Sequence, residues 1–567
     1  MKCSKLTMVV SLCTVIACAP DEGQVPEFSV VEASIPELQE LMETGRLTSR
    51  QLVTAHLVRI ALYEDRLNAA ISINEEVLAE ADALDAERAA GNVRGPLHGI
   101  PVALKDNIQT THLPTTGGAL AFAGYVPPFE ATVTKNLREA GAIILAKAGL
   151  TEFANFMAGS PNQMPGNYNA LTGFGFNPYD PRRDPRVGRA DGRPVLSTGG
   201  SSSGIGTAAS FWLANVGTDT GGSVISPSNA NMLVGIRPTL GRVSRWGIAP
   251  VTLDHDMAGP MARTVADAAI MLGAMEGSAP DPNDPATGVC EPLSEGDYRP
   301  HLLARGLEGA RVGIPRAFYF DAVELSDGRS VGGLRDDQAR LIAEAIQVLE
   351  EQGATVVDPA DVPSLADVDP EDNFAAWPLC VGGGQAKGSD EGCSVNFKYG
   401  MKRDFDAWLA SLGPSAPVKS LTELREWNLA HASAGSMKYQ QSRFDISDEM
   451  DIEADRARND ADVAKDARLS RAQGLDAVFA QHDLDAILTP GSRGAGLAAR
   501  AGYPIIVVPF GFVANGSSES FPDAFDAQPA PFGIGLTGPA CSEPRLIELA
   551  YSFEQATMRR VAPRDLR

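Results

Sequence analysis

Short apolar runs, separated by stretches rich in glycine and proline, are the feature that most limits how this chain can fold. Such runs occupy residues 101–104, 142–146, 486–488 and 505–508. Runs of this length are typical of strands that are buried on both faces, and helical patterns alternate with them. The sequence therefore predicts an α/β fold.

Helices are predicted before the first of these runs. Ser34 is followed three residues later by Glu37, and Thr48 by Gln51, and both pairs are typical of capping boxes that open helices. The stretch 74–90, rich in Ala, Glu and Leu, predicts a third helix. We expect these segments to contribute packing and no chemistry.

The composition is that of a globular protein with an acidic surface. Of 567 residues, 44% are hydrophobic and 21% are charged, and the net charge is −24. This charge repels phosphate backbones, so we expect no nucleic-acid partner. Residues 277–285 could be a linker or a surface loop, so they do not mark a clear domain boundary. We therefore expect one domain over residues 31–567, with a variable insertion around 365–440. The sequence does not determine the oligomeric state, and a homodimer is compatible with it.

The first 18 residues have the pattern of a secretory signal peptide. Lys2 and Lys5 precede an apolar run over 8–17, which is too short to span a bilayer. The run ends at Cys18 in a pattern that resembles the lipobox of bacterial lipoproteins, where the cysteine is lipidated. An ordinary cleaved signal peptide is the alternative. Residues 19–30 would be a linker. We expect an exported protein, either a periplasmic or cell-envelope lipoprotein or a secreted protein. It would contact a membrane only through the lipid anchor.

Beyond this leader the chain has four cysteines, Cys290, Cys380, Cys393 and Cys541. An oxidising compartment would allow disulfides among them, and the short, glycine-rich segment between Cys380 and Cys393 makes these two the expected pair. Buried free thiols are the alternative. No CxxC or histidine-rich spacing indicates a metal site.

Two loops rich in glycine and serine carry the candidate chemistry. Residues 197–206 contain four glycines and four serines, Ser201 among them, and the apolar stretch 207–216 that follows predicts the start of a buried helix. In the second loop, 217–223, Gly221 and Gly222 stand immediately before Ser223. Consecutive N–H groups could therefore point at one place near the Ser223 hydroxyl, as an oxyanion hole requires.

A serine hydroxyl is a poor nucleophile without a base, and Lys105 is the candidate. It ends the apolar run 101–104, a position where a lysine would be desolvated. Burial would lower its pKa from about 10.4 toward neutrality. Taken alone, the segment could equally place a surface lysine at the end of a strand.

Together these segments resemble the amidase signature family, and most closely its secreted, peptide amidase-like branch. The resemblance extends over residues 31–557, with the matching motifs in the family's order. The motifs are GPLHGIPVALKDNI at 95–108, STGGSSSGIG at 197–206, GTDTGGSVISP at 217–227, the stretch 234–268, and three C-terminal segments at 484–490, 501–509 and 532–557.

The resemblance implies the amidase signature fold, with a large mixed central β-sheet covered by helices on both faces. It also implies hydrolysis of a small-molecule or peptide amide through an acyl-enzyme, with release of ammonia or an amine and without a metal or an organic cofactor. The Ser201 to Ser223 spacing is shorter than is usual in the family, with the shortening between 207 and 215. The implied roles are Lys105 as base, Ser201 as a bridging serine on a cis peptide bond with Gly200, Ser223 as nucleophile, the N–H groups of Thr220, Gly221, Gly222 and Ser223 as oxyanion hole, and Ser202 and Asp219 as supports of the loops.

Two other readings of the sequence remain open. Residues 200–204 match the GxSxG elbow of serine esterases, which needs a strand directly before it and a catalytic histidine, here His431 or His482. A lipoprotein that binds amides without cleaving them is the second alternative. The segments 155–176 and 373–408 would shape the substrate pocket, and a peptide C-terminal amide or an aryl or alkyl amide is the expected substrate.

Overall fold

The computed structural model describes residues 28–293, 296–516 and 520–566. The predicted leader 1–18, with the predicted lipidation site Cys18, and most of the linker 19–30 lie outside the described residues. Within the described ranges, we find no helix with the length and apolar character needed to cross a membrane.

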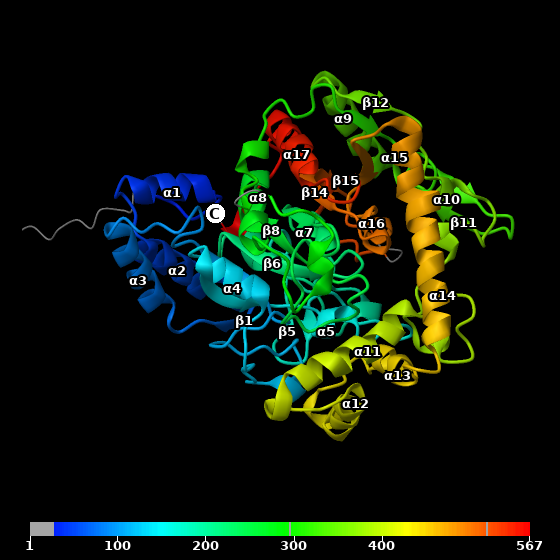
Figure 1. The fold of residues 1–567 in the computed structure, drawn as a ribbon, viewed down its shortest axis with the longest axis horizontal. Coiled ribbons are helices and arrows are strands. Elements are labelled where there is room, and N and C mark those ends of the chain that lie inside the picture. Colours follow the sequence, from blue (N-terminus) through cyan, green and yellow to red (C-terminus); the bar gives the residue numbers. More distant parts are fainter. Residues whose placement is uncertain (1–27, 294–295, 517–519, 567) are drawn as a thin grey trace, which may run out of the picture.

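An 11-stranded mixed sheet forms the centre of the molecule (Figure 1). Across the sheet the order is β1 (Ala70–Ile73), β3 (Ile143–Ala148), β2 (Pro101–Lys105), β6 (Ala214–Asp219), β8 (Met257–Ala262), β7 (Val234–Arg237), β14 (Ile505–Val513), β15 (Ala530–Thr537), β13 (Ala486–Pro490), β9 (Arg311–Gly313) and β12 (Thr355–Val357). Parallel pairing joins β2 to β3 and β6, and β9 to β12 and β13, while the other neighbours are antiparallel. The four predicted apolar runs are confirmed as β2, β3, β13 and β14.

Helices cover both faces of the sheet because side chains of the central strands alternate between two hydrophobic cores. Val102 and Leu104 belong to one core, while Ala103 belongs to the other. On β14, Ile506 and Ile505 face opposite cores in the same way. The first face is covered by α1 (Ile35–Glu43), α4 (Thr132–Glu139), α8 (Val265–Met275), α9 (Asp336–Glu351) and α17 (Glu543–Thr557), and the second by α2 (Ser49–Leu67), α3 (Val77–Ala89), α6 (Ile205–Ala208), α7 (Ile225–Ala230) and α16 (Ala495–Ala501).

A further group of helices packs around an aromatic core of its own, at the lower edge of the view in Figure 1. Phe153 of α5 (Glu152–Asn155) contacts Phe405 and Phe444 edge to face, and Trp408 lies beside Phe405. This core joins the segment after β3 to helices from much later in the chain. The group comprises α11 (Asn396–Ser411), α12 (Leu421–Ala430) and α13 (Ser442–Asp448). The helices α14 (Arg456–Ala467), α15 (Asp476–His482) and α10 (Pro363–Ala366) lie at the right of the view in Figure 1. Two small hairpins pair β4 (Tyr168–Asn169) with β5 (Gly173–Phe174) and β10 (Ala322–Glu324) with β11 (Ser330–Gly332).

The N-terminal helices form as the sequence predicts. Ser34 and Thr48 both accept hydrogen bonds from the N3 backbone, and the Glu37 and Gln51 side chains complete two capping boxes. The third predicted helix is α3. The prediction of a helix start over 207–216 is wrong in extent, because α6 ends at Ala208 after one turn and β6 begins at Ala214. The segment 207–215, where the chain is shorter than is usual in the family, therefore begins at the end of a one-turn helix.

Two disulfides link the four cysteines. The expected pair Cys380–Cys393 is confirmed, and it closes a segment with a sequence separation of 13. The second, Cys290–Cys541, joins positions 251 residues apart and was not predicted as a pair. It ties the segment after α8 to the start of α17.

Candidate active site

Lys105 lies at the end of β2 and is completely buried. Its Nζ donates to Thr218 Oγ1 at 2.7 Å and lies 3.1 Å from Ser201 Oγ and 3.4 Å from the Thr218 carbonyl oxygen. Burial lowers the pKa of Lys105 to about 7, against the opposing charges of Asp256 and Asp219. A substantial share of neutral amine therefore exists at neutral pH.

The register of the sheet brings these groups together. Strands β2 and β6 are parallel and pair Leu104 with Val216. Lys105 follows this pair on β2 and Thr218 follows it on β6, so the two residues lie close together. The Ser202 hydroxyl then bridges the two glycine-rich loops, donating to the Thr218 carbonyl at 3.1 Å and accepting from the Thr218 N–H at 3.2 Å. The Thr151 N–H also donates to the Ser201 carbonyl at 3.1 Å.

The expected cis bond between Gly200 and Ser201 is absent from this structure. The cis peptide bonds of the described residues are Ser160–Pro161 and Asp358–Pro359. A trans bond is the low-energy state, since a cis bond before a residue other than proline costs about 3–4 kcal/mol, and Ser201 reaches Lys105 without it. In the described part of the chain no hydrogen bond joins Ser201 to Ser223.

The loop after β6 is shaped by the buried carboxylate of Asp219. Its Oδ1 accepts from the Gly222 N–H at 2.7 Å and lies 3.5 Å from the Arg237 guanidinium, and its Oδ2 accepts from the Val224 N–H at 2.7 Å. Gly222 adopts φ 118°, which a side chain would strain. These contacts fold the loop tightly and leave Ser223 half-exposed.

One of the four N–H groups predicted for the oxyanion hole has an acceptor in this structure. The Gly222 N–H donates to Asp219 Oδ1 at 2.7 Å. The N–H groups of Thr220, Gly221 and Ser223 have no acceptor among the described residues, so these three remain the candidate donors.

Gly200 lies against the same loop. A side chain at Gly200 would come within 3.2 Å of Ser223 Cα and 3.3 Å of Pro227 Cδ. The close approach of the two loops therefore depends on a glycine at this position, and it places the backbone of residue 200 directly beside Ser223.

The floor of the site contains another buried carboxylate, Asp256. It accepts a hydrogen bond from the Thr220 hydroxyl and one from the Val251 N–H at 2.8 Å. Burial raises the pKa of Asp256 to about 7. A small cavity lined by Asn107, Thr218, Thr220 and Asp256 lies beneath the loop.

The two segments expected to shape the pocket do meet beside the candidate nucleophile loop. A Cβ at Gly221 would lie 3.8 Å from the ring of Phe397, whose centroid is 5.9 Å from that of Phe156. The Gly383 N–H donates to the Ser160 carbonyl at 2.8 Å. Phe156 and Phe397 thus form an aromatic wall next to the exposed Gly221.

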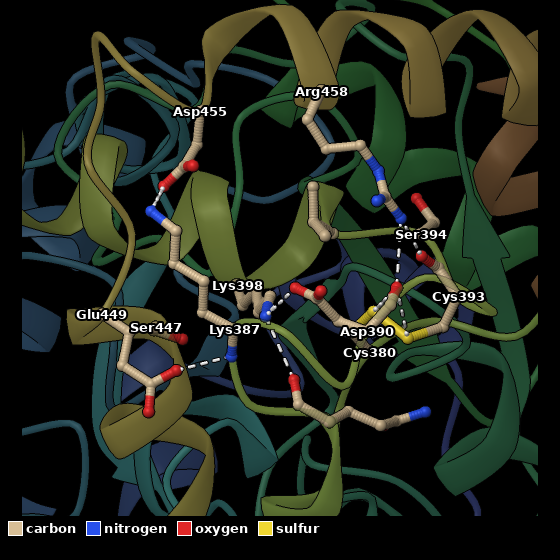
Figure 2. A network of polar contacts seen from close by, with 12 residues as sticks. Cys380, Lys387, Asp390, Cys393, Ser394, Lys398, Ser447, Glu449, Asp455 and Arg458 are labelled. Atoms are coloured by element: carbon tan, nitrogen blue, oxygen red, sulfur yellow. Dashed lines mark hydrogen bonds and ion pairs between the residues drawn. A yellow bond between two sulfur atoms is a disulfide. The ribbon is translucent and has the colours of Figure 1, made fainter.

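Polar contacts and a disulfide fix the start of α11, which carries this wall (Figure 2). The buried Nζ of Lys398 donates to Asp390 Oδ2 at 2.6 Å and to the Gln385 carbonyl at 3.0 Å. Arg458 of α14 donates to the carbonyl oxygens of Asp390 and Cys393 at 3.0 and 3.1 Å. Phe397 is therefore held on a rigid support.

The described residues do not supply the strand and the histidine that the GxSxG elbow of a serine esterase requires. Residues 195–200 form bends and irregular chain, so no strand leads into Gly200 within the described residues. His431 stacks on Trp427 at the surface, with a centroid distance of 3.8 Å, and His482 ends α15. Among the described residues, the hydrogen-bond partner of the Ser201 hydroxyl is Lys105 and not a histidine.

Comparison with known proteins identifies the family. The family model described as Amidase matches residues 51–547. The chain belongs to the amidase signature family. It is 34% identical to a probable amidase of Arabidopsis thaliana over 545 residues, covering 95% of this chain and 92% of the relative.

Solved amidase structures agree in fold. The native peptide amidase of Stenotrophomonas maltophilia superposes with a TM-score of 0.74 at 33% identity, covering 94% of this chain and 98% of that one. The peptide amidase in complex with the competitive inhibitor chymostatin gives a TM-score of 0.75 at 32% identity, covering 94% and 100%. The amidase signature fold predicted from the sequence, with helices on both faces of a large mixed sheet, is confirmed.

Sequence reasoning missed three residues around Lys105: Thr218, Asn107 and Asp256. All three stand inside the quoted motifs, and the closeness of Asn107 to Lys105 and of Thr218 to Ser223 along the chain was a usable signal. Asp256 lies in the stretch 234–268, away from both, and the pairing of Asp219 with Met257 across β6 and β8 brings it to the site.

Proposed function

We propose that this amidase hydrolyses the C–N bond of carboxylic amides through Ser223, Ser201 and Lys105. The contact between Ser201 Oγ and the buried Lys105 Nζ carries the proposal, because burial lowers the pKa of this lysine to about 7. A general base is most effective when its pKa lies near the working pH.

The proposed reaction has two halves. Ser223 Oγ forms a bond to the amide carbon, the carbonyl π electrons move to its oxygen, and the Ser223 proton passes to Ser201 as the proton of Ser201 passes to neutral Lys105. The C–N bond then breaks, and the same relay returns a proton to the leaving nitrogen. Water, activated by the same base, hydrolyses the ester and releases the acid.

The oxyanion of the tetrahedral intermediate would be bound by the free N–H groups of Thr220, Gly221 and Ser223. Removing one such donor typically costs about 3–4 kcal/mol of transition-state stabilisation. In this proposal Asp219, through the Gly222 N–H, holds the loop in shape.

The proposed substrate is a small-molecule or peptide amide, including a peptide C-terminal amide, and the products are the acid and ammonia or an amine. Similarity to solved peptide amidases and the aromatic wall beside Gly221 support this choice. Two disulfides and the predicted leader support a location outside the cytoplasm.

The test is release of ammonia or amine from a panel of peptide, aryl and alkyl amides. We expect turnover by the parent protein and a loss of several orders of magnitude, about 10⁴-fold or more, in Ser223→Ala and in Lys105→Ala. Ser197→Ala, which changes an exposed serine of the loop that carries Ser201, serves as the matched control. Full activity of Ser223→Ala on a substrate of the parent would contradict the proposal.

A further inference from the structure

We infer that Thr218 is a positioning residue that orients the amine of Lys105 so that its lone pair faces Ser201. The inference rests on the proposed role of Lys105 as base and names what aligns it. Thr218 stands in the strand β6, between the two glycine-rich loops.

A neutral lysine amine has two N–H groups and one lone pair. Three oxygen atoms surround Lys105 Nζ: Thr218 Oγ1 at 2.7 Å, Thr218 O at 3.4 Å and Ser201 Oγ at 3.1 Å. A carbonyl oxygen can only accept, and a hydroxyl can donate or accept. When both N–H groups point at the two oxygens of Thr218, the lone pair is left for the Ser201 hydroxyl.

Asn107 fixes the hydroxyl of Thr218 in its role as acceptor. Its Nδ2 donates to Thr218 Oγ1 at 3.2 Å and to the Ala249 carbonyl at 3.1 Å. Because the Ala249 oxygen cannot donate, the Asn107 amide must present its NH₂ group on this side. Thr218 Oγ1 therefore receives hydrogen bonds from both Asn107 and Lys105.

The other charged groups near Lys105 have partners of their own, so we expect them to stay in place when Thr218 is changed. Asp219, the next residue of β6, is held by Arg237 of β7, and Asp256 faces the site from the segment before β8. Lys147 of the neighbouring strand β3 lies 3.4 Å from Asp106 and pairs with it. A change in Thr218 variants can thus be assigned to the lost hydroxyl.

The test compares Thr218→Val, which removes the acceptor at nearly constant volume, with Thr218→Ser, which keeps it. We expect Thr218→Val to lower kcat about 10- to 100-fold with little change in KM, because the base is misaligned while the substrate is still bound. The acid limb of kcat/KM should also move to lower pH, since a hydroxyl acceptor stabilises an ammonium more than an amine. Thr218→Ser should restore both values to within about threefold of the parent.

A purely structural role for Thr218 predicts a different result, namely a loss of activity with the acid limb unmoved and no rescue by serine, and that result would overturn the inference. Parental kcat and pH profile in Thr218→Val would overturn it as well. Thr218→Ala, judged for folding by its thermal melting curve, provides a second removal variant with the same expectation. Ser223→Ala distinguishes failure of this inference from failure of the proposed function. If Ser223→Ala is inactive and Thr218→Val is fully active, only the role of Thr218 is rejected. If Ser223→Ala is active, the proposed function itself is rejected.

Discussion

At the scale of single residues, three buried groups show how burial favours the neutral form. Burial lowers the pKa of Lys105 to about 7 and raises that of Asp256 to about 7. It also lowers the pKa of His56, enclosed between α2 and the segment after α6, to about 3. The change in Lys105 serves the proposed chemistry, and the change in His56 affects stability alone.

The pH dependence of catalysis follows from the pKa of Lys105. Below about pH 7 the lysine is protonated and cannot accept a proton, so kcat/KM should fall as the pH falls through this value. The limb should be absent or displaced in the residual activity of Lys105→Ala. A profile for the parent that is flat from pH 5 to 9, in rates measured with an uncharged amide, would be incompatible with a lysine base.

A second variant tests the direction in which the charge of Asp256 changes the pKa of Lys105. Above about pH 7 Asp256 carries a negative charge that favours the ammonium form of Lys105, so Asp256→Asn should lower the pKa of Lys105 and move the acid limb to lower pH. Asparagine can still bond to the Thr220 hydroxyl. A shift to higher pH would show that the charge of Asp256 does not act on this lysine.

His56 makes the fold sensitive to acid. Its pKa is lower in the folded protein than the ordinary value of about 6.5, so the unfolded chain binds the proton first and stability is lost as the pH falls below that value. Between pH 7 and pH 5 this one group should cost about 2 kcal/mol. His56→Asn, which keeps a donor for the Ser210 carbonyl, should lose correspondingly less stability in urea titrations at the two pH values.

The exposed His431 provides the control for that experiment. His431→Asn should lose the same stability between pH 7 and pH 5 as the parent. If His56→Asn also matched the parent, burial of a neutral His56 would not be the cause of the acid sensitivity.

At the scale of secondary-structure elements, local sequence signals were sufficient to predict the helices and strands whose formation depends mainly on their own residues. The capping boxes at Ser34 and Thr48 place two helix starts, and the apolar runs place β2, β3, β13 and β14. The stretch after Ser201 was harder, because an Ala-rich composition favours a helix while the pairing of β6 with β2 and β8 requires a strand. Tertiary pairing overrode local propensity there.

The closed segment before α11 should be important for both stability and substrate binding. The disulfide Cys380–Cys393 closes a loop with a sequence separation of 13, and removing it in Cys380→Ser/Cys393→Ser should cost about 3 kcal/mol of unfolding free energy. Because Phe397 follows directly on this segment, KM for a bulky amide should rise more than kcat falls. Urea titration and steady-state kinetics measure the two effects.

Lys387→Met is the matched control within the same network (Figure 2). Lys387 forms an exposed ion pair with Asp455 at 2.8 Å, and such pairs contribute little to stability because solvent screens them. This variant should keep the stability and KM of the parent. An unchanged KM in the double cysteine variant would show that α11 does not depend on the disulfide for its position.

At the scale of the whole molecule, the sequence predicted the fold class and the three polar residues of the proposed relay, because each of these residues lies in a motif formed by consecutive residues. It could not predict contacts that depend on how distant strands pair. Asp256 reaches the site through β8, and Cys290 meets Cys541 across 251 residues. The engagement of the Gly222 N–H by Asp219 depends on the exact turn of the loop and was also beyond the sequence.

Covalent labelling of the nucleophile examines the roles of Ser223 and Lys105 together. The parent, Lys105→Ala, Ser223→Ala and Ser197→Ala would be treated with a fluorophosphonate, and the modified residue would be mapped by mass spectrometry of proteolytic peptides. We expect one adduct on Ser223, formed at the parental rate in Ser197→Ala, much more slowly in Lys105→Ala and not at all in Ser223→Ala. An adduct on Ser201, or labelling of Ser223 at an unchanged rate without Lys105, would contradict these roles.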